Sequence, residues 1–153
     1  RPQLLIADEP TTALDVTIQA QILKLMRELQ TEMDTTILMI THNLGIIAEI
    51  CDRVGVMYAG TMAEICQTDE LFREPLHPYT QGLLYAIPRI DHDLPRLETI
   101  EGAVPNLAKP PSGCRFHPRC PYAMPICSQE KPKMMMVRPD HQVACHLYQE
   151  GSQ

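Results

Sequence analysis

Residues 4–15 read LLIADEPTTALD: four apolar residues, two carboxylates, a proline and a short polar turn. The apolar run predicts a short strand covered on both faces, as in a parallel sheet. Asp8 and Glu9 follow it directly, and Pro10 ends the strand because proline lacks a backbone N–H. We therefore expect two acidic side chains at the carboxyl end of a buried strand.

The residues that follow alternate between helix and strand patterns. Between residues 16 and 30 apolar residues recur every three or four positions, which predicts one face of a helix with Asp15 as its N-cap. The apolar, β-branched run at 36–40 predicts a second strand, which ends next to His42, and a helix is expected at 44–50. This pattern indicates an α/β fold with a parallel sheet, which places ligands at the carboxyl ends of its strands.

The middle of the chain predicts a hairpin and two short helices. Residues 54–58 and 61–65 are apolar runs joined by Ala59-Gly60, which is typical of a tight turn between antiparallel strands. The helices are expected at residues 69–73 and 79–86.

Proline then divides the chain. Twelve of the 14 prolines lie between Pro75 and Pro139, a density that long helices and central strands do not accommodate. We therefore divide the chain into an α/β core at residues 1–87, a proline-rich linker at 88–113 and a small irregular cysteine-rich module at 114–153.

Composition narrows the range of functions. The 153 residues carry a net charge of −6, which disfavours nucleic acid as a partner because a phosphate backbone attracts basic surfaces. No apolar run is long enough to span a bilayer, and we read no secretory signal at the start. Because a predicted strand begins almost directly after Arg1, we expect further sequence upstream.

The acidic strand end has two interpretations. A carboxylate there can hold Mg²⁺ through water, and its neighbour can orient or deprotonate the water that attacks a phosphate. His42, after the next strand, can donate a hydrogen bond to charge on that phosphate. The alternatives are a solvated strand end and a histidine that satisfies only local hydrogen bonds, and these residue types alone leave both open.

Four of the six cysteines lie in one short stretch, with the spacing Cys114-x5-Cys120-x6-Cys127-x17-Cys145. Four thiolates can enclose Zn²⁺ or a [4Fe–4S] cluster. The spacing matches neither the usual paired zinc motif nor the common ferredoxin motif, so zinc, iron–sulfur and plain unpaired thiols all stay open. Six cysteines without a secretory signal indicate a reducing compartment, where a metal site is expected before disulfides.

Residues 4–15 resemble the Walker B segment and D-loop of ABC ATPases, and residues 40–43 (ITHN) resemble the switch-histidine segment of the next strand. The resemblance implies a truncated P-loop NTPase core. In that core Asp8 would bind Mg²⁺ through water, and Glu9 would be the catalytic base or would position water. His42 would contact the γ-phosphate of ATP.

The continuation TTALDVT at residues 11–17 is similar to the ATPases of oligopeptide and dipeptide importers. The resemblance implies that Asp15 contacts a second ATPase subunit across bound ATP. It also implies two transmembrane permease subunits, an indirect peptide-binding protein, and a peripheral location on the cytoplasmic face of the membrane. It does not identify the cargo, which in such systems is a dipeptide, a longer peptide, glutathione or a nickel chelate.

The chain departs from the pattern of that family in two respects. The phosphate-binding loop GxxxxGK[ST], the glutamine loop and the LSGG signature do not occur in it, and we expect them upstream of Arg1. Without the amides and lysine that cradle phosphates, the fragment alone is expected neither to bind ATP tightly nor to hydrolyse it. In addition, Cys66 stands where these proteins often have glycine.

Residues 110–121 (PPSGCRFHPRCP) and 141–147 (HQVACHL) look like the C-terminal extension of the same transporter ATPases. The resemblance implies a [4Fe–4S] cluster, with Zn²⁺ as the alternative in which His117 or His146 replaces a cysteine. The implied cluster ligands are Cys114, Cys120, Cys127 and Cys145.

Two other functions remain as alternatives. One is a stand-alone metal-binding regulatory module, with iron–sulfur or zinc, that keeps a vestigial ATPase sequence. The other is a soluble ABC ATPase that acts on nucleic acid or in translation, which the acidic charge and the cysteine extension argue against. A phosphate-binding loop in the upstream reading frame would favour the importer over the stand-alone module.

Overall fold

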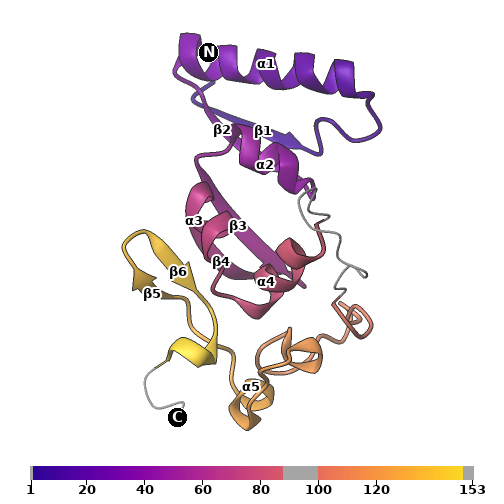
Figure 1. The fold of residues 1–153 in the computed structure, drawn as a ribbon, viewed down its shortest axis with the longest axis vertical. Coiled ribbons are helices and arrows are strands. Elements are labelled where there is room, and N and C mark those ends of the chain that lie inside the picture. Colours follow the sequence, from indigo (N-terminus) through magenta and orange to yellow (C-terminus); the bar gives the residue numbers. More distant parts are fainter. Residues whose placement is uncertain (1, 88–99, 150–153) are drawn as a thin grey trace. The chain divides into compact units, whose positions relative to one another are not determined.

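The computed structural model describes residues 2–87 and 100–149 and divides into two compact units, which meet in the sequence between Cys51 and Asp52 (Figure 1). We refer to them as the N-terminal unit and the C-terminal unit. None of the helices within the described ranges has the length and apolarity that a membrane-spanning segment needs.

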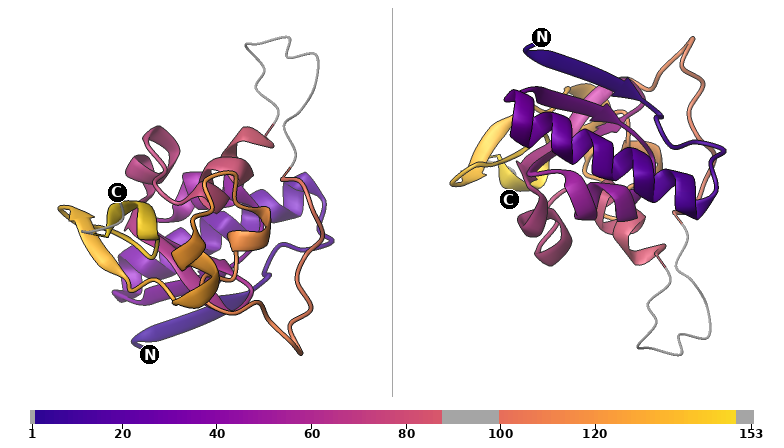
Figure 2. Two further views of the ribbon diagram at one scale, coloured as in Figure 1. Left: turned by 90° about the horizontal axis from the view of Figure 1, so that it is seen from below. Right: turned by 90° about the horizontal axis from the view of Figure 1, so that it is seen from above.

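The N-terminal unit is built on two parallel strands. Strand β1 (Leu4–Asp8) pairs with β2 (Thr36–Ile40), and Asp8 lies opposite Ile40 at the carboxyl end of the pair. Helix α1 (Val16–Met33) connects the strands and lies along them (Figures 1 and 2), and α2 (Leu44–Ile50) follows β2. The predicted order of strand, helix, strand and helix is therefore confirmed.

Helix α1 begins where the sequence predicts and ends later. The Asp15 side chain accepts hydrogen bonds from the backbone N–H groups of Thr17 and Ile18, so it is the N-cap. The helix continues to Met33, beyond the predicted end at residue 30, and stops at Asp34 in a left-handed conformation with φ of 51°. No glycine or proline marks this end, which is why the sequence pattern placed it too early.

The prediction that these strands are covered on both faces is wrong for the described chain. Alternate residues of β1 and β2 are largely exposed, with Ile6 at 60% and Leu38 at 50% of their surfaces. Leu4 and Ile40 share this face and are also about half exposed. An apolar sheet face of this kind normally packs against another layer of protein.

The C-terminal unit contains a four-stranded antiparallel sheet in the order β3-β4-β6-β5. Strands β3 (Arg53–Tyr58) and β4 (Thr61–Gln67) form the predicted hairpin. Ala59 and Gly60 both have positive φ, as a two-residue turn with the twist of a hairpin requires. Helices α3 (Thr68–Arg73) and α4 (Pro78–Tyr85) follow, close to the predicted ranges.

The other two strands come from the stretch predicted to be irregular. Strand β6 (His141–Val143) pairs with β4, and β5 (Met135–Arg138) pairs with β6. The same stretch holds α5 (Pro125–Gln129) and short 3₁₀ turns at His117–Arg119 and His146–Tyr148. The expectation of irregular structure is therefore wrong for residues 135–143, where β4 supplies a hydrogen-bonding edge that the local sequence does not reveal.

Side chains also join the hairpin to the cysteine-bearing stretch. Tyr58, Tyr79 and Phe116 form an aromatic cluster with ring centroids 4.6 to 5.5 Å apart. Arg119 donates hydrogen bonds to the backbone oxygens of Ile100 and Glu101, and to the Tyr58 hydroxyl. The predicted boundary near Pro88 lies outside the described residues, so the division at residues 88–113 stays a prediction.

Candidate functional site

The carboxyl ends of β1 and β2 bring Glu9 and His42 together. His42 Nδ1 lies 2.7 Å from Glu9 Oε1, and the Thr12 hydroxyl donates a 2.5 Å hydrogen bond to Glu9 Oε2. Parallel pairing explains the contact, because strands that run in the same direction end at the same edge of the sheet. Both side chains remain accessible, with the His42 side chain 80% and that of Glu9 36% exposed.

Glu9 is held as a carboxylate. Its pKa lies below the usual value, first because Thr12 donates a hydrogen bond to it and second because His42 does. Its backbone is also unusual, with φ of 47°, a region that non-glycine residues seldom occupy and that is enriched at functional sites. A carboxylate that is firmly ionised orients water well and is a weak proton acceptor.

Asp8 and Asp15 lie near this pair in sequence and serve different local purposes. Asp8 is exposed at the end of β1, so its oxygens are open to an ion or to water. Asp15 uses one oxygen, Oδ1, to cap α1. Within residues 2–87 and 100–149, neither belongs to a group of three or more side chains close enough to enclose a metal ion. A lone carboxylate is still a usual protein ligand for hydrated Mg²⁺, which takes its other ligands from water and phosphate.

The four clustered cysteines are brought near one another, and none forms a disulfide. The Cys114 N–H donates to the Cys127 carbonyl at 2.8 Å. Gly113 makes this approach possible, because its φ is 63° and a Cβ there would collide with the backbone of Cys127 and Ser128. The turn through His117 then leads to Cys120.

Burial and mutual repulsion keep the thiols of Cys114, Cys120 and Cys145 protonated when no cation is bound. Burial raises the pKa of Cys114 and Cys120, and it raises that of Cys145 to about 12. Negative charge on each of the other three cysteines adds to the shift at Cys145, so all four lie within electrostatic reach. Even so, among the residues that the structure describes, no three of these sulfurs lie within 4.8 Å of one another.

The two histidines named as alternative zinc ligands are both engaged. His117 Nδ1 lies 2.8 Å from the Cys114 carbonyl oxygen, and His146 Nε2 lies 2.8 Å from that of Glu130. His146 Nδ1 is buried and makes no hydrogen bond with the described residues. Each histidine therefore keeps one ring nitrogen that could accept a metal bond.

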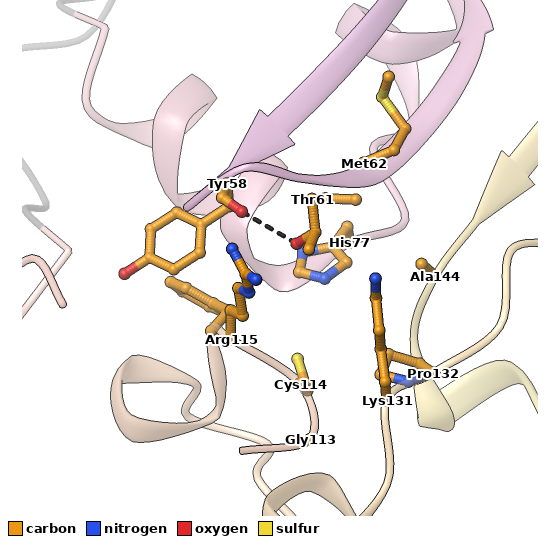
Figure 3. Close-up of a pocket in the computed structure, with 12 residues that line it drawn as sticks. Tyr58, Thr61, Met62, His77, Gly113, Cys114, Arg115, Lys131, Pro132 and Ala144 are labelled. Carbon is orange, nitrogen blue, oxygen red and sulfur yellow. Dashed lines mark hydrogen bonds between the residues drawn. The ribbon is translucent and has the colours of Figure 1, made fainter. Parts of the chain in front are cut away.

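A pocket lies beside Cys114 (Figure 3). Figure 3 shows the side chains of Cys114, Arg115, Lys131 and His77 reaching toward one space. The lining residues come from the β3–β4 hairpin and the cysteine-bearing stretch, together with His77. Burial lowers the pKa of His77 to about 4, so near neutral pH the positive charge here belongs to Arg115 and Lys131.

A buried polar group in this unit was missed from the sequence. Glu64 is fully buried on β4 and accepts hydrogen bonds from the backbone N–H groups of Leu76 and His77, at 2.8 and 2.9 Å. His141 Nε2 on β6 lies 2.7 Å from Glu64 Oε1. The only local signal is one charged residue in a mostly apolar strand, and its partners lie 12 to 77 residues away.

Comparison with known proteins gives consistent matches. The family described as "Oligopeptide/dipeptide transporter, C-terminal region" matches residues 63–127. The oligopeptide transport ATP-binding protein AppD of Bacillus subtilis is 54% identical over 149 residues, which are 97% of this chain and 45% of that protein.

Two further relatives agree. The dipeptide transport ATP-binding protein DppD of Caldanaerobacter subterraneus is 48% identical, over 98% of this chain and 46% of its own length. The oligopeptide transport ATP-binding protein OppD of Salmonella typhimurium is 56% identical, over 86% of this chain and 39% of its own length. The chain therefore spans less than half the length of each of these relatives.

Proposed function

Because this chain belongs to the family of oligopeptide and dipeptide transport ATP-binding proteins, we propose that it is the distal part of an ATPase that energises peptide import. The observation that carries the proposal is the contact between Glu9 and His42 at the carboxyl ends of two parallel strands. That edge is where an α/β sheet presents catalytic side chains to a nucleotide.

Each side chain at this edge has a role in the proposal. Glu9, a carboxylate with two of its four acceptor positions in use, orients the water that attacks the γ-phosphate of ATP. His42 holds Glu9 through Nδ1–H, and when both ring nitrogens carry a proton Nε2–H donates to a phosphate oxygen. Asp8 binds Mg²⁺ through water, and Mg²⁺ when bound neutralises charge on the phosphates.

We propose that the phosphate-binding loop, glutamine loop and signature belong to a part of the protein that this sequence does not contain. The exposed apolar face of β1 and β2 supports the proposal, because a parallel sheet is normally covered on both faces. On this account residues 1–153 alone neither bind ATP tightly nor hydrolyse it. Measurable turnover by the purified fragment would contradict that statement.

The test of the active-site assignment is Glu9→Gln in the full-length protein, assembled with its transport partners. The amide keeps the shape and removes the charge that orients water, so we expect ATP hydrolysis to fall by about 10²–10⁴-fold while ATP binding persists. Glu32→Gln, an exposed change on α1, is the matched control. Hydrolysis at the normal rate in the Glu9 variant would refute the assignment.

The partners in this proposal are a second ATPase subunit, two permease subunits and, indirectly, a peptide-binding protein. Asp15 contacts the second ATPase subunit, for which its Oδ2 remains available beside the capping Oδ1. Peptide is the cargo class, since the relatives are named for oligopeptide and dipeptide transport. The location is the cytoplasmic face of the membrane, through the permease subunits.

For the four cysteines we propose a [4Fe–4S] cluster, with Zn²⁺ as the competing occupant. A single zinc ion bound at about 2.3 Å would draw four sulfurs to about 3.8 Å from one another. The observed sulfurs are neighbours without any three lying within 4.8 Å, and a cluster whose irons bind separate thiolates suits such wider spacing. Arg115 and Lys131, which reach toward the space beside Cys114, suit the negative charge of a thiolate-bound cluster (Figure 3).

Metal analysis distinguishes the occupants. Anaerobic purification of the full-length protein is expected to yield iron and acid-labile sulfide in equal amounts, with visible absorbance that disappears in Cys120→Ser. Cys51→Ser, a change outside the set of four, should leave the iron content unchanged. Stoichiometric zinc without iron at these four residues would overturn the cluster.

A further inference from the structure

Three buried side chains of metal-binding type meet on one face of the β4–β6 pair. One oxygen of Glu64, one ring nitrogen of His141 and the sulfur of Cys66 all lie within 4.8 Å of one another. Each of the three residues is at most 1% exposed. None of them belongs to the set of four cysteines described above.

Strand geometry explains why they meet. Glu64 and Cys66 are two positions apart on β4, so their side chains point to the same face of the sheet. Glu64 pairs with Val143 across the antiparallel ladder, and this register directs His141 toward Cys66. The juxtaposition is thus fixed by the backbone pairing of two strands, which makes it a rigid support for ligands.

Hydrogen bonds leave acceptor capacity unused at this point. A carboxylate has about four lone-pair positions, and Glu64 uses three of them for Leu76, His77 and His141. His141 Nδ1 is buried without a hydrogen-bond partner among the described residues. A single ion bound by both Glu64 and His141 would take the place of the proton that now lies between Glu64 Oε1 and His141 Nε2, which are 2.7 Å apart.

We propose that Glu64, Cys66 and His141 bind a Zn²⁺ ion that cross-links β4 to β6. The ligand chemistry favours zinc, which takes sulfur, imidazole nitrogen and carboxylate oxygen together, whereas Mg²⁺ and Ca²⁺ take oxygen. The charges also balance, because one thiolate and one carboxylate neutralise a divalent cation beside a neutral imidazole. A water completes the tetrahedral set.

The amount of movement required is small. Zinc bonds of about 2.0–2.3 Å place ligand atoms about 3.3–3.8 Å apart in a tetrahedron. The three ligand atoms already lie within 4.8 Å of one another, and Glu64 Oε1 and His141 Nε2, now 2.7 Å apart, would open to that spacing. The ion would tie a strand near the middle of the chain to one near its end, and so stabilise the C-terminal unit through the strand pairing.

Zinc binding by the full-length protein tests the proposal. Equilibrium dialysis against Zn²⁺, followed by metal analysis, should show one equivalent that Cys66→Ser loses and that both Cys51→Ser and Cys120→Ser retain. Loss of an outer-shell partner typically weakens metal affinity by about 10–100-fold. Loss of Cys66, a direct ligand, should weaken the zinc affinity by at least as much. Equal zinc content and affinity in the Cys66→Ser and unmodified proteins would overturn it.

A measurement on the unmodified protein guards against a variant that fails to fold. Alkylation of Cys66 in mild denaturant, read by peptide mass spectrometry, should slow at least tenfold when Zn²⁺ is added, since a metal-bound thiolate is shielded. Alkylation of Cys51 in the same samples is the internal control. The same Cys66 rate with and without Zn²⁺ would refute the site, whatever the outcome for ATP hydrolysis or iron content.

Discussion

The buried carboxylate of Glu64 makes the sharpest test of how the C-terminal unit is held together. Glu64→Gln keeps the volume of the side chain but replaces one acceptor oxygen by an NH₂ group. Since the two oxygens accept from Leu76 and His77 separately, one of these buried N–H groups must lose its partner. An unsatisfied buried donor costs about 1–3 kcal/mol.

That cost has a local readout. At 1.4 kcal/mol per tenfold change, it corresponds to about 5- to 150-fold faster hydrogen exchange of the Leu76 and His77 amides, if they exchange by local opening. Exchange measured by mass spectrometry or NMR in the full-length protein, with a metal chelator present, isolates the hydrogen-bond effect from any bound zinc. We expect the β4 and β6 amides to lose protection as well, because His141 shares Glu64.

The control is Glu101→Gln, an exposed glutamate of the same unit, for which a change within about 0.5 kcal/mol is expected. If exchange at Leu76 and His77 is the same in the Glu64 variant as in the control, the bonds to Glu64 do not hold this segment in place. In that case the β4–β6 pair would not be the rigid support that the proposed zinc ligands require.

Two further predictions concern backbone shape and pH. Gly113→Ala should reduce metal incorporation at the four cysteines, because the added Cβ would meet the Cys127 carbonyl and the φ of 63° disfavours alanine. Gly102→Ala is the control and should have the weaker effect, because only the Arg119 side chain lies close to it. Equal metal content in the two variants would contradict the prediction. Burial lowers the pKa of His77 from its usual 6.5 to about 4, so the unfolded chain binds this proton more tightly than the folded chain does. The free energy of unfolding should therefore be highest above about pH 6.5 and decline by up to about 3 kcal/mol as the pH falls to 4. His77→Asn, which can still cap α4 as His77 does through Tyr79 N–H, should lose this part of the pH dependence in thermal melts, and an unchanged profile would refute it.

Local patterns in the sequence were enough for most of the N-terminal unit and for the β3–β4 hairpin of the C-terminal unit. The strands at residues 4–8 and 36–40, the helix that Asp15 caps and the hairpin at Ala59-Gly60 all depend on neighbouring residues, and the structure contains each of them. The proximity of Glu9 and His42 follows from parallel strands that end at one edge. Their catalytic roles stay predictions.

Features that depend on distant partners were not predictable in the same way. Strands β5 and β6 have no strong alternation of their own in the sequence. Pairing with β4 makes this segment a strand pair, because it satisfies backbone groups that the local sequence leaves open. The contact between Glu64 and His141 forms only through that pairing.

The pairing of β4 with β6 also determines when the C-terminal unit can finish folding during synthesis on the ribosome. Glu64 is translated 77 residues before His141, so the nascent hairpin presents an open edge and an uncompensated carboxylate until residues 141–143 have emerged. A ribosome that stalls or terminates before that point releases a chain whose β4 edge is free to pair with other molecules. Such truncated products should be prime substrates for chaperones and proteases, and sequence separation of this size slows the final closure of the unit.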